Sequence, residues 1–125
     1  MNVVDSSAWL AYFADEPNAD FFAEAVEAVG ELIVPTISLY EVFKRVFQQR
    51  GEDAALQAGA LMQQGQVVEL NASLALSAAR FGADHRLPLA DSIIYATARS
   101  HGATLWTQDA DFEGLPGVQY RPPQS

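Results

Sequence analysis

The sequence predicts an α/β protein with a mostly parallel central sheet of four to five strands flanked by helices. Short runs of β-branched and aromatic residues alternate along the chain with longer helical segments, a pattern typical of parallel sheets whose strands are joined by helices. The chain has 125 residues, half of them hydrophobic, which suits one domain with its own core. We expect that domain to span residues 1–121 and residues 122–125 to form a short loose tail.

Five short apolar runs are expected to be the strands. They are residues 3–4, 32–34, 67–68, 104–107 and 118–120. Gly30, Gly65 and Gly102 each separate a helical segment from one of these runs, and Gly51 separates two helical segments. Glycine at such places commonly ends a helix in the left-handed conformation.

The helices are expected between these strands. They are residues 7–13, residues 18–29, a pair divided at Gly51, and a final pair at residues 72–84 and 91–100 with Pro88 between them. Asn71 stands just before one helix and fits the role of its N-cap. His101 ends another helix, where an imidazole is favoured by the helix dipole.

Charge and composition exclude several classes of function. Sixteen acidic and seven basic side chains give a net charge of −9, which argues against a purely electrostatic binder of DNA or anionic membranes. The absence of cysteine excludes disulfides, thiolate metal sites and cysteine nucleophiles. No apolar stretch is long enough for a signal peptide or a membrane span, so a cytoplasmic protein without membrane contact is expected.

Four acids fall where ligands bind in open parallel sheets, beyond the carboxyl ends of the strands. Asp5 ends the first predicted strand, and Asp109 follows the fourth. Glu41 lies in the helix after the second strand, and Asp91 opens the helix of residues 91–100. The topology therefore predicts that these four carboxylates share one edge of the sheet.

Each acid also has an ordinary structural interpretation. Asp91 would be favoured by the helix dipole, and Glu41 would pair with the basic residues three and four positions on. Asp5 and Asp109 would bond nearby backbone amides in turns. Taken together, however, two carboxylates 4 Å apart repel each other by about 4 kcal/mol, so the cluster calls for a cation.

Oxygen ligands and the absence of cysteine favour Mg²⁺, with Mn²⁺ as a substitute. A metal ion held by such acids activates a water that hydrolyses phosphodiesters, so no side-chain nucleophile is needed. The sequence contains neither a GxSxG motif nor a glycine-rich phosphate loop.

At these residues the sequence resembles the PIN-domain family, in particular the small VapC-type toxin ribonucleases of bacterial toxin–antitoxin systems. The resemblance covers nearly the whole chain. It rests on four segments in order: residues 3–7 (VVDSS), 35–41 (PTISLYE), 87–91 (LPLAD) and 105–112 (LWTQDADF).

The resemblance implies a single PIN-like domain and a metal-dependent endoribonuclease toxin. The metal-binding and catalytic acids would be Asp5, Glu41, Asp91 and Asp109. Ser7 and Thr107 would support them, and Asp111 either supports the site or caps the turn before Phe112. The resemblance also implies an antitoxin partner, an RNA substrate and a homodimer.

Two further groups of residues carry open alternatives. Lys44 and Arg45 lie on the helix of Glu41 and either form a solvated face or contact RNA phosphates. Trp9, Tyr12 and Phe13 present more aromatic surface than one buried helix face uses, and either belong to the core or line an antitoxin groove.

Two other functions are alternatives to a nuclease. A catalytically silent PIN-like module that binds a protein partner has the same sequence features and differs in its lack of nuclease activity. A phospho-accepting receiver domain has similar length and acidity, but it needs a lysine after a late strand, and the only lysine here is Lys44 on a helix.

The rest of the chain stays negatively charged even when a cation neutralises the site acids. This net charge favours a structured RNA substrate recognised by its shape over unselective cleavage of bulk RNA.

Overall fold

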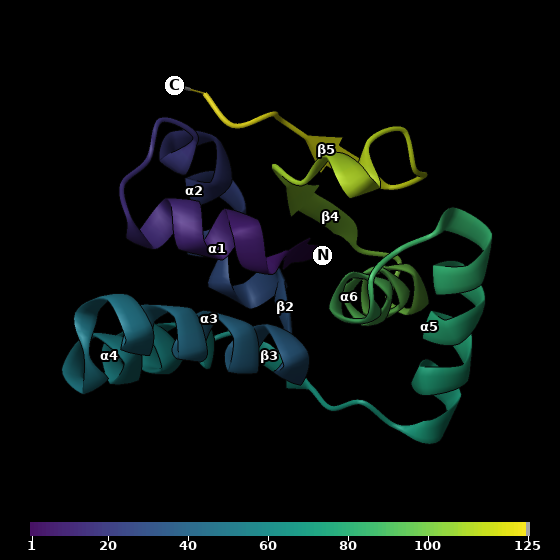
Figure 1. Cartoon of the computed structure of the whole chain (residues 1–125), viewed down its shortest axis with the longest axis horizontal. Helices are drawn as coiled ribbons and strands as arrows, with labels where there is room; N and C mark the ends of the chain where they lie inside the picture. Colours follow the sequence, from purple (N-terminus) through teal and green to yellow (C-terminus); the bar gives the residue numbers. More distant parts are fainter. Residues whose placement is uncertain (125) are drawn as a thin grey trace.

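A computed structural model of the chain describes residues 1–124 and shows one five-stranded sheet (Figure 1). The strands are β1 (Asn2–Val4), β2 (Leu32–Pro35), β3 (Gln66–Val68), β4 (Thr104–Thr107) and β5 (Val118–Tyr120). They lie in the order β3-β2-β1-β4-β5, and every neighbouring pair is parallel. The predicted fold class is confirmed.

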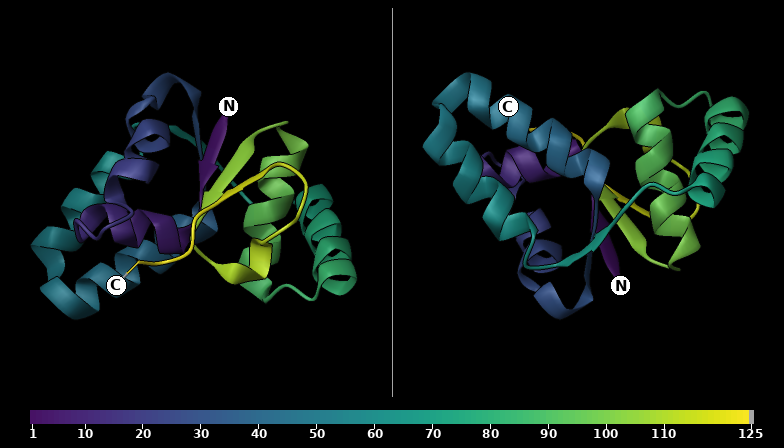
Figure 2. Two further views of the ribbon diagram at one scale, coloured as in Figure 1. Left: turned by 90° about the horizontal axis from the view of Figure 1, so that it is seen from above. Right: turned by 90° about the horizontal axis from the view of Figure 1, so that it is seen from below.

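Six α-helices are found in residues 1–124 and cover both faces of the sheet. They are α1 (Ser6–Phe13), α2 (Ala19–Glu27), α3 (Thr36–Arg50), α4 (Glu52–Met62), α5 (Ala72–His85) and α6 (Leu89–Ser100). Helices α1 to α4 lie on one side of the sheet, and α5 and α6 lie on the other (Figure 2). Short 3-10 turns occupy Val29–Glu31 and Ala110–Phe112.

The central strands are buried on both faces, as is typical of parallel sheets. Val4 and Val34 point into the cluster beneath α1 to α4, and Val3 and Ile33 point into the cluster beneath α6. This alternation within each strand explains why the strands appear in the sequence as unbroken apolar runs.

Two local expectations about glycine are corrected. Gly51 and Gly102 have the expected positive φ, at 89° and 61°, but Gly30 and Gly65 do not. A Cβ built on Gly65 would lie 2.9 Å from the carbonyl oxygen of Leu32, so close backbone approach explains that glycine. The helix expected over residues 18–29 ends earlier, because Ala28 leaves the helical conformation with ψ at 66°.

The groove interpretation of Trp9 is wrong, because its side chain is completely buried. It lies in the same cluster as Phe22 and Met62, and its ring stacks on Phe13 with centroids 5.6 Å apart. The indole therefore belongs to the core. Tyr12 and Phe13 are partly exposed, so their surface role stays a prediction.

The start of the expected C-terminal tail is attached to the domain, because Asn18 Nδ2 donates a hydrogen bond to the carbonyl oxygen of Pro122 at 2.9 Å. Ser125, the last residue of that tail, lies outside the described residues. Within residues 1–124, none of the helices combines the length and hydropathy needed to cross a membrane.

Candidate metal centre

The sheet order brings three of the predicted acids to one place. Asp5 directly follows β1, and Asp109 lies two residues beyond β4, the strand that pairs with β1. Asp91 lies in the first turn of α6, which packs against β1, β2 and β4. Neighbouring parallel strands end at the same edge, so these side chains meet there.

Asp5 is almost completely buried and surrounded by donors. Its carboxylate accepts hydrogen bonds from the Ser7 hydroxyl (2.8 and 3.0 Å), the Thr107 hydroxyl (2.8 Å) and the Ala8 amide (2.9 Å). Burial raises the pKa of Asp5 to about 6, although these hydrogen bonds act in the opposite direction; repulsion from Asp109 adds to the rise. Ser7 and Thr107 thus hold the Asp5 carboxylate in one orientation.

Three further carboxylates form a tight group beside it. Asp91, Asp109 and Asp111 each place an oxygen within 4.8 Å of the others. Burial, together with repulsion from Asp109 and Asp5, raises the pKa of Asp91 to about 8. Repulsion from Asp111 and a hydrogen bond with Asp109 raise the pKa of this carboxyl further.

Asp109 is held by the local bonds of an ordinary turn and also belongs to the acidic group. The backbone amide of Asp109 donates to the Thr107 hydroxyl oxygen, and the amide of Asp111 donates to Asp109 Oδ1, both at 2.9 Å. Thr107 therefore links Asp5 to Asp109 directly. Asp109 therefore has both expected roles: it bonds a backbone amide in a turn, and it belongs to the acidic group.

Glu41 lies outside that group of three. Its Oε1 accepts a 2.6 Å hydrogen bond from Ser6, and the two residues line one hollow with the exposed side chains of Lys44 and Arg45. The expected local pairing of Glu41 with these bases is thus replaced by a bond to a residue 35 positions away. The partnership of Ser6 was missed from the sequence, although Ser6 directly follows Asp5.

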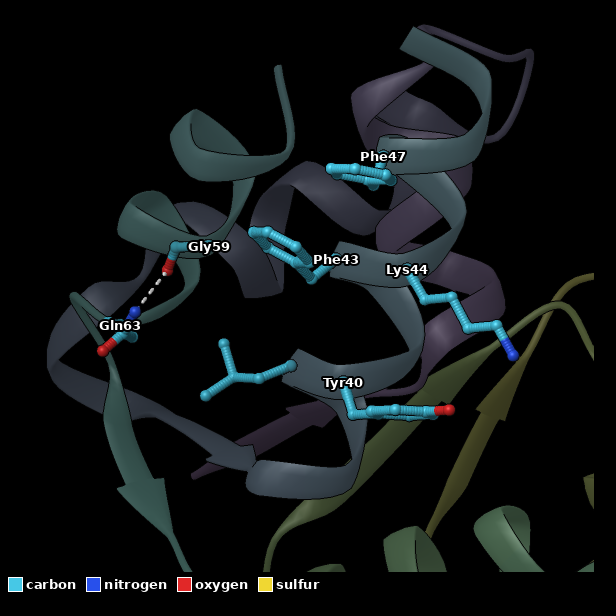
Figure 3. A pocket seen from close by; sticks show the side chains of 7 residues that line it. Tyr40, Phe43, Lys44, Phe47, Gly59 and Gln63 are labelled. Carbon is cyan, nitrogen blue, oxygen red and sulfur yellow. Dashed lines mark hydrogen bonds between the residues drawn. The ribbon is translucent and has the colours of Figure 1, made fainter. Parts of the chain in front are cut away.

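A separate apolar groove lies between α3 and α4, with a volume of about 500 Å³. Tyr40, Phe43 and Phe47 line it from α3, and Gly59 lies across from them on α4 (Figure 3). Lys44 extends away from the phenylalanines in this view. None of its lining residues is acidic, so this groove and the acidic group are different features.

The donor set at the acidic edge fits a hard divalent cation. Carboxylate oxygens from Asp91, Asp109 and Asp111 converge, with the hydrogen-bonded carboxylate of Asp5 next to them. Such oxygens are the ligands that Mg²⁺ and Mn²⁺ prefer, and a cation there would remove the repulsion that raises the Asp91 pKa. The cluster contains neither thiolate nor imidazole.

Comparison with known proteins supports one family. The family model described as PIN domain matches residues 3–118. A toxin–antitoxin complex from Klebsiella pneumoniae contains a similar chain, with 24% identity, coverage of 95% of this chain and 96% of that chain, and a TM-score of 0.79. VapC20 of Mycobacterium tuberculosis, described as a Sarcin-Ricin loop cleaving toxin, has 21% identity, coverage of 98% and 100%, and a TM-score of 0.80.

VapBC2 from Rickettsia felis, solved with a DNA fragment from its promoter, has 11% identity, coverage of 98% of both chains and a TM-score of 0.73. At these identities the solved structures establish the shared fold. A search among curated proteins gave no match.

Proposed function

This chain belongs to the PIN domain family, and from that premise we propose that it is a metal-dependent endoribonuclease, the toxin of a toxin–antitoxin pair. The observation that carries the proposal is the convergence of Asp91, Asp109 and Asp111 beside the buried Asp5 at the carboxyl edge of the sheet. The chain would hydrolyse phosphodiester bonds of a structured RNA with an activated water.

The proposed roles follow the geometry. Asp5, Asp91 and Asp109, together with Asp111, would hold Mg²⁺, for which Mn²⁺ would substitute. A bound cation would lower the pKa of the attacking water and neutralise charge on the leaving oxygen. Asp5 would contribute a carboxylate whose direction is already fixed by its hydroxyl and amide donors, so little reorganisation is needed on binding.

Glu41 would be a further metal-binding acid at the outer side of this centre, and its hydrogen bond from Ser6 would hold it in place. Lys44 and Arg45, exposed in the same hollow, would contact phosphates on the approach to the acids. Adding back the four charges of the site acids to −9 still leaves −5, so non-specific attraction for RNA is weak. This favours an RNA recognised by its folded shape, and a relative described as cleaving the Sarcin-Ricin loop is consistent with that choice.

An RNA cleavage assay tests the proposal directly. The purified chain would be incubated with a stem–loop RNA and with an unstructured RNA of the same composition, in Mg²⁺, in Mn²⁺ and in a chelator. Endonucleolytic cuts in the stem–loop RNA that depend on either metal are expected. A protein that binds its antitoxin but cuts no RNA under any of these conditions would instead be the catalytically silent module.

The antitoxin would bind between α1, α3 and α4. Phe13 borders two adjacent hollows there, which also contain Val46, Arg50 and Leu61. An apolar peptide segment fits these hollows, and a basic residue beyond it would offset the repulsion among the site acids. Trp9 lies in the core below and would support this surface without touching the peptide.

Phe13→Ala is expected to weaken binding of the proposed antitoxin by about 2 kcal/mol, roughly thirtyfold in Kd, because an aromatic anchor is lost. Phe47→Ala is the matched control, since it removes the same side chain from the separate α3–α4 groove. Isothermal titration calorimetry would measure both. Equal affinities for Phe13→Ala and the wild type would contradict the proposed antitoxin surface.

The implied homodimer would use two apolar faces that lack a partner within the described residues. Leu76 is 75% exposed on α5, and the exposed alanines at 72, 75 and 79 extend its stripe. The α3–α4 groove is open at Gly59, where a Cβ would meet only Phe43, at 3.9 Å. In such a dimer, the exposed stripe on α5 of one copy would pack into the α3–α4 groove of the other copy.

Charge supports one register of that contact. In an antiparallel arrangement, Leu76 and Arg80 of α5 lie opposite Leu56 and Glu52 of α4, because each pair is four residues apart. Leu76→Glu is expected to weaken dimerisation at least about tenfold. Arg80→Glu should weaken it as well, and Glu52→Arg in the same chain should restore it. Sedimentation velocity would show the states, and a failed restoration would contradict this register.

A further inference from the structure

Asn18 is a buried polar residue at the N-cap position of α2, but its side chain does not cap that helix. It stands directly before α2, where asparagine commonly caps a helix, yet its side chain forms no capping hydrogen bond. Only 1% of the residue is exposed. Its amide is directed instead toward segments about a hundred residues away in the sequence.

The Asn18 Nδ2 group joins two of these segments. It lies 3.2 Å from Gln108 Oε1, 3.4 Å from the carbonyl oxygen of Arg121 and 2.9 Å from that of Pro122, all hydrogen-bond acceptors. The backbone amide of Arg121 in turn donates to the carbonyl oxygen of Thr107 at 3.0 Å. The end of β4 and the segment after β5 are thus joined by a backbone bond and also through the Asn18 side chain.

The other polar atom of the Asn18 side chain, Oδ1, indicates that the hydrogen bonds donated by Nδ2 explain why an asparagine stands here. Asn18 Oδ1 is buried without a hydrogen-bond partner in the described residues, which carries a desolvation cost. An apolar side chain would pack there without that cost, and helix capping does not explain the asparagine. The bonds donated by Nδ2 are the interactions that account for this residue.

These bonds act on the segment that carries Asp109. Gln108 lies between Thr107, whose hydroxyl donates to Asp5, and Asp109, whose amide donates to the same hydroxyl oxygen. Residues 107–109 are therefore anchored at two points, at the Thr107 hydroxyl by Asp5 and at the Gln108 side chain by Asn18. Between two anchors the peptide has little freedom to turn Asp109 away from Asp91.

We propose that Asn18 is a positioning residue for the acidic centre: it binds Gln108 and the carbonyl groups of residues 121–122, and so fixes the direction of Asp109. The segment after β5 is then part of the support of the site. The consequence for metal binding rests on the proposed function, whereas the consequence for the backbone of residues 107–109 does not.

The test is Asn18→Ala in the full-length chain, with two readouts. Calorimetry with Mn²⁺ should show an affinity lowered about tenfold, the size typical of losing an outer partner of a metal ligand. In the metal-free protein, amide hydrogen exchange at Asp109 and Arg121 should become faster. Gln108→Ala removes one acceptor of the same network and should move both readouts in the same direction, should Asn18→Ala fail to fold.

Asn71→Ala is the matched control. Asn71 caps α5 through a 2.8 Å bond from the Leu74 amide, so its loss destabilises the protein without touching residues 107–109. Mn²⁺ affinity should stay at the wild-type value in this variant. An affinity loss of the same size in both asparagine variants, or unchanged exchange at Asp109 in Asn18→Ala, would overturn the proposal. Should the wild type bind no Mn²⁺, the proposed function fails and the exchange measurement alone decides the role of Asn18.

Discussion

Asp91→Asn is expected to lower metal-dependent RNA cleavage by about 100-fold or more while the fold is kept. The amide has the shape of the carboxylate but lacks its charge, so one ligand of the proposed cation is lost. Asp91 lies in the first turn of α6, where an asparagine of nearly the same size replaces it without a change in packing volume. The measurement is cleavage of the stem–loop RNA at saturating Mg²⁺.

The same variant should be more stable than the wild type when metal is absent. Burial and repulsion from Asp109 and Asp5 raise the pKa of Asp91 to about 8, so ionising this carboxyl disfavours the folded state. Loss of activity combined with a higher melting temperature would distinguish a functional acid from a structural one.

Asp84→Asn provides the control for this substitution, because Asp84 is exposed at the end of α5. It removes one negative charge from the chain and should leave cleavage unchanged. Full cleavage activity in purified Asp91→Asn protein would refute the proposed mechanism.

The stability of the metal-free protein is expected to fall as pH rises from about 4 to about 8. An unperturbed aspartic acid side chain has a pKa of 3.8, whereas folding raises the pKa of Asp5 to about 6 and that of Asp91 to about 8. Between these values the folded state holds more protons than the unfolded state, so the free energy of unfolding decreases with pH. Chemical denaturation at intervals across this range would measure the slope.

Divalent metal should reverse this loss near neutral pH. At 100 times its dissociation constant, Mg²⁺ or Mn²⁺ would add about 2.7 kcal/mol to the free energy of unfolding, because it binds the folded state alone. The gain should be much smaller in Asp91→Asn, and the pH slope of that variant should flatten above about pH 6. Melting temperatures that do not respond to either metal at pH 7.5 would contradict a shared metal site.

The sequence alone determines the strands and one helix cap, because adjacent residues decide both features. Short apolar runs predict the strands, and Asn71 before an apolar helix predicts the cap of α5. The four-part motif and the rule that ligands bind at strand ends predict that Asp5, Asp91 and Asp109 lie close together. In the structure the parallel sheet places these three acids close together. The roles of these acids, and that of Glu41, stay predictions.

Only the tertiary structure decided which side chains of a helix are buried and which distant residues meet. Trp9, Tyr12 and Phe13 are nearly adjacent in sequence, but α1 turns Trp9 completely into the core and leaves the other two partly exposed. The partners of Asn18 and Glu41 lie tens of residues away. A pattern of neighbours predicts backbone hydrogen bonding and helix period, whereas these contacts arise from how the finished elements pack against one another.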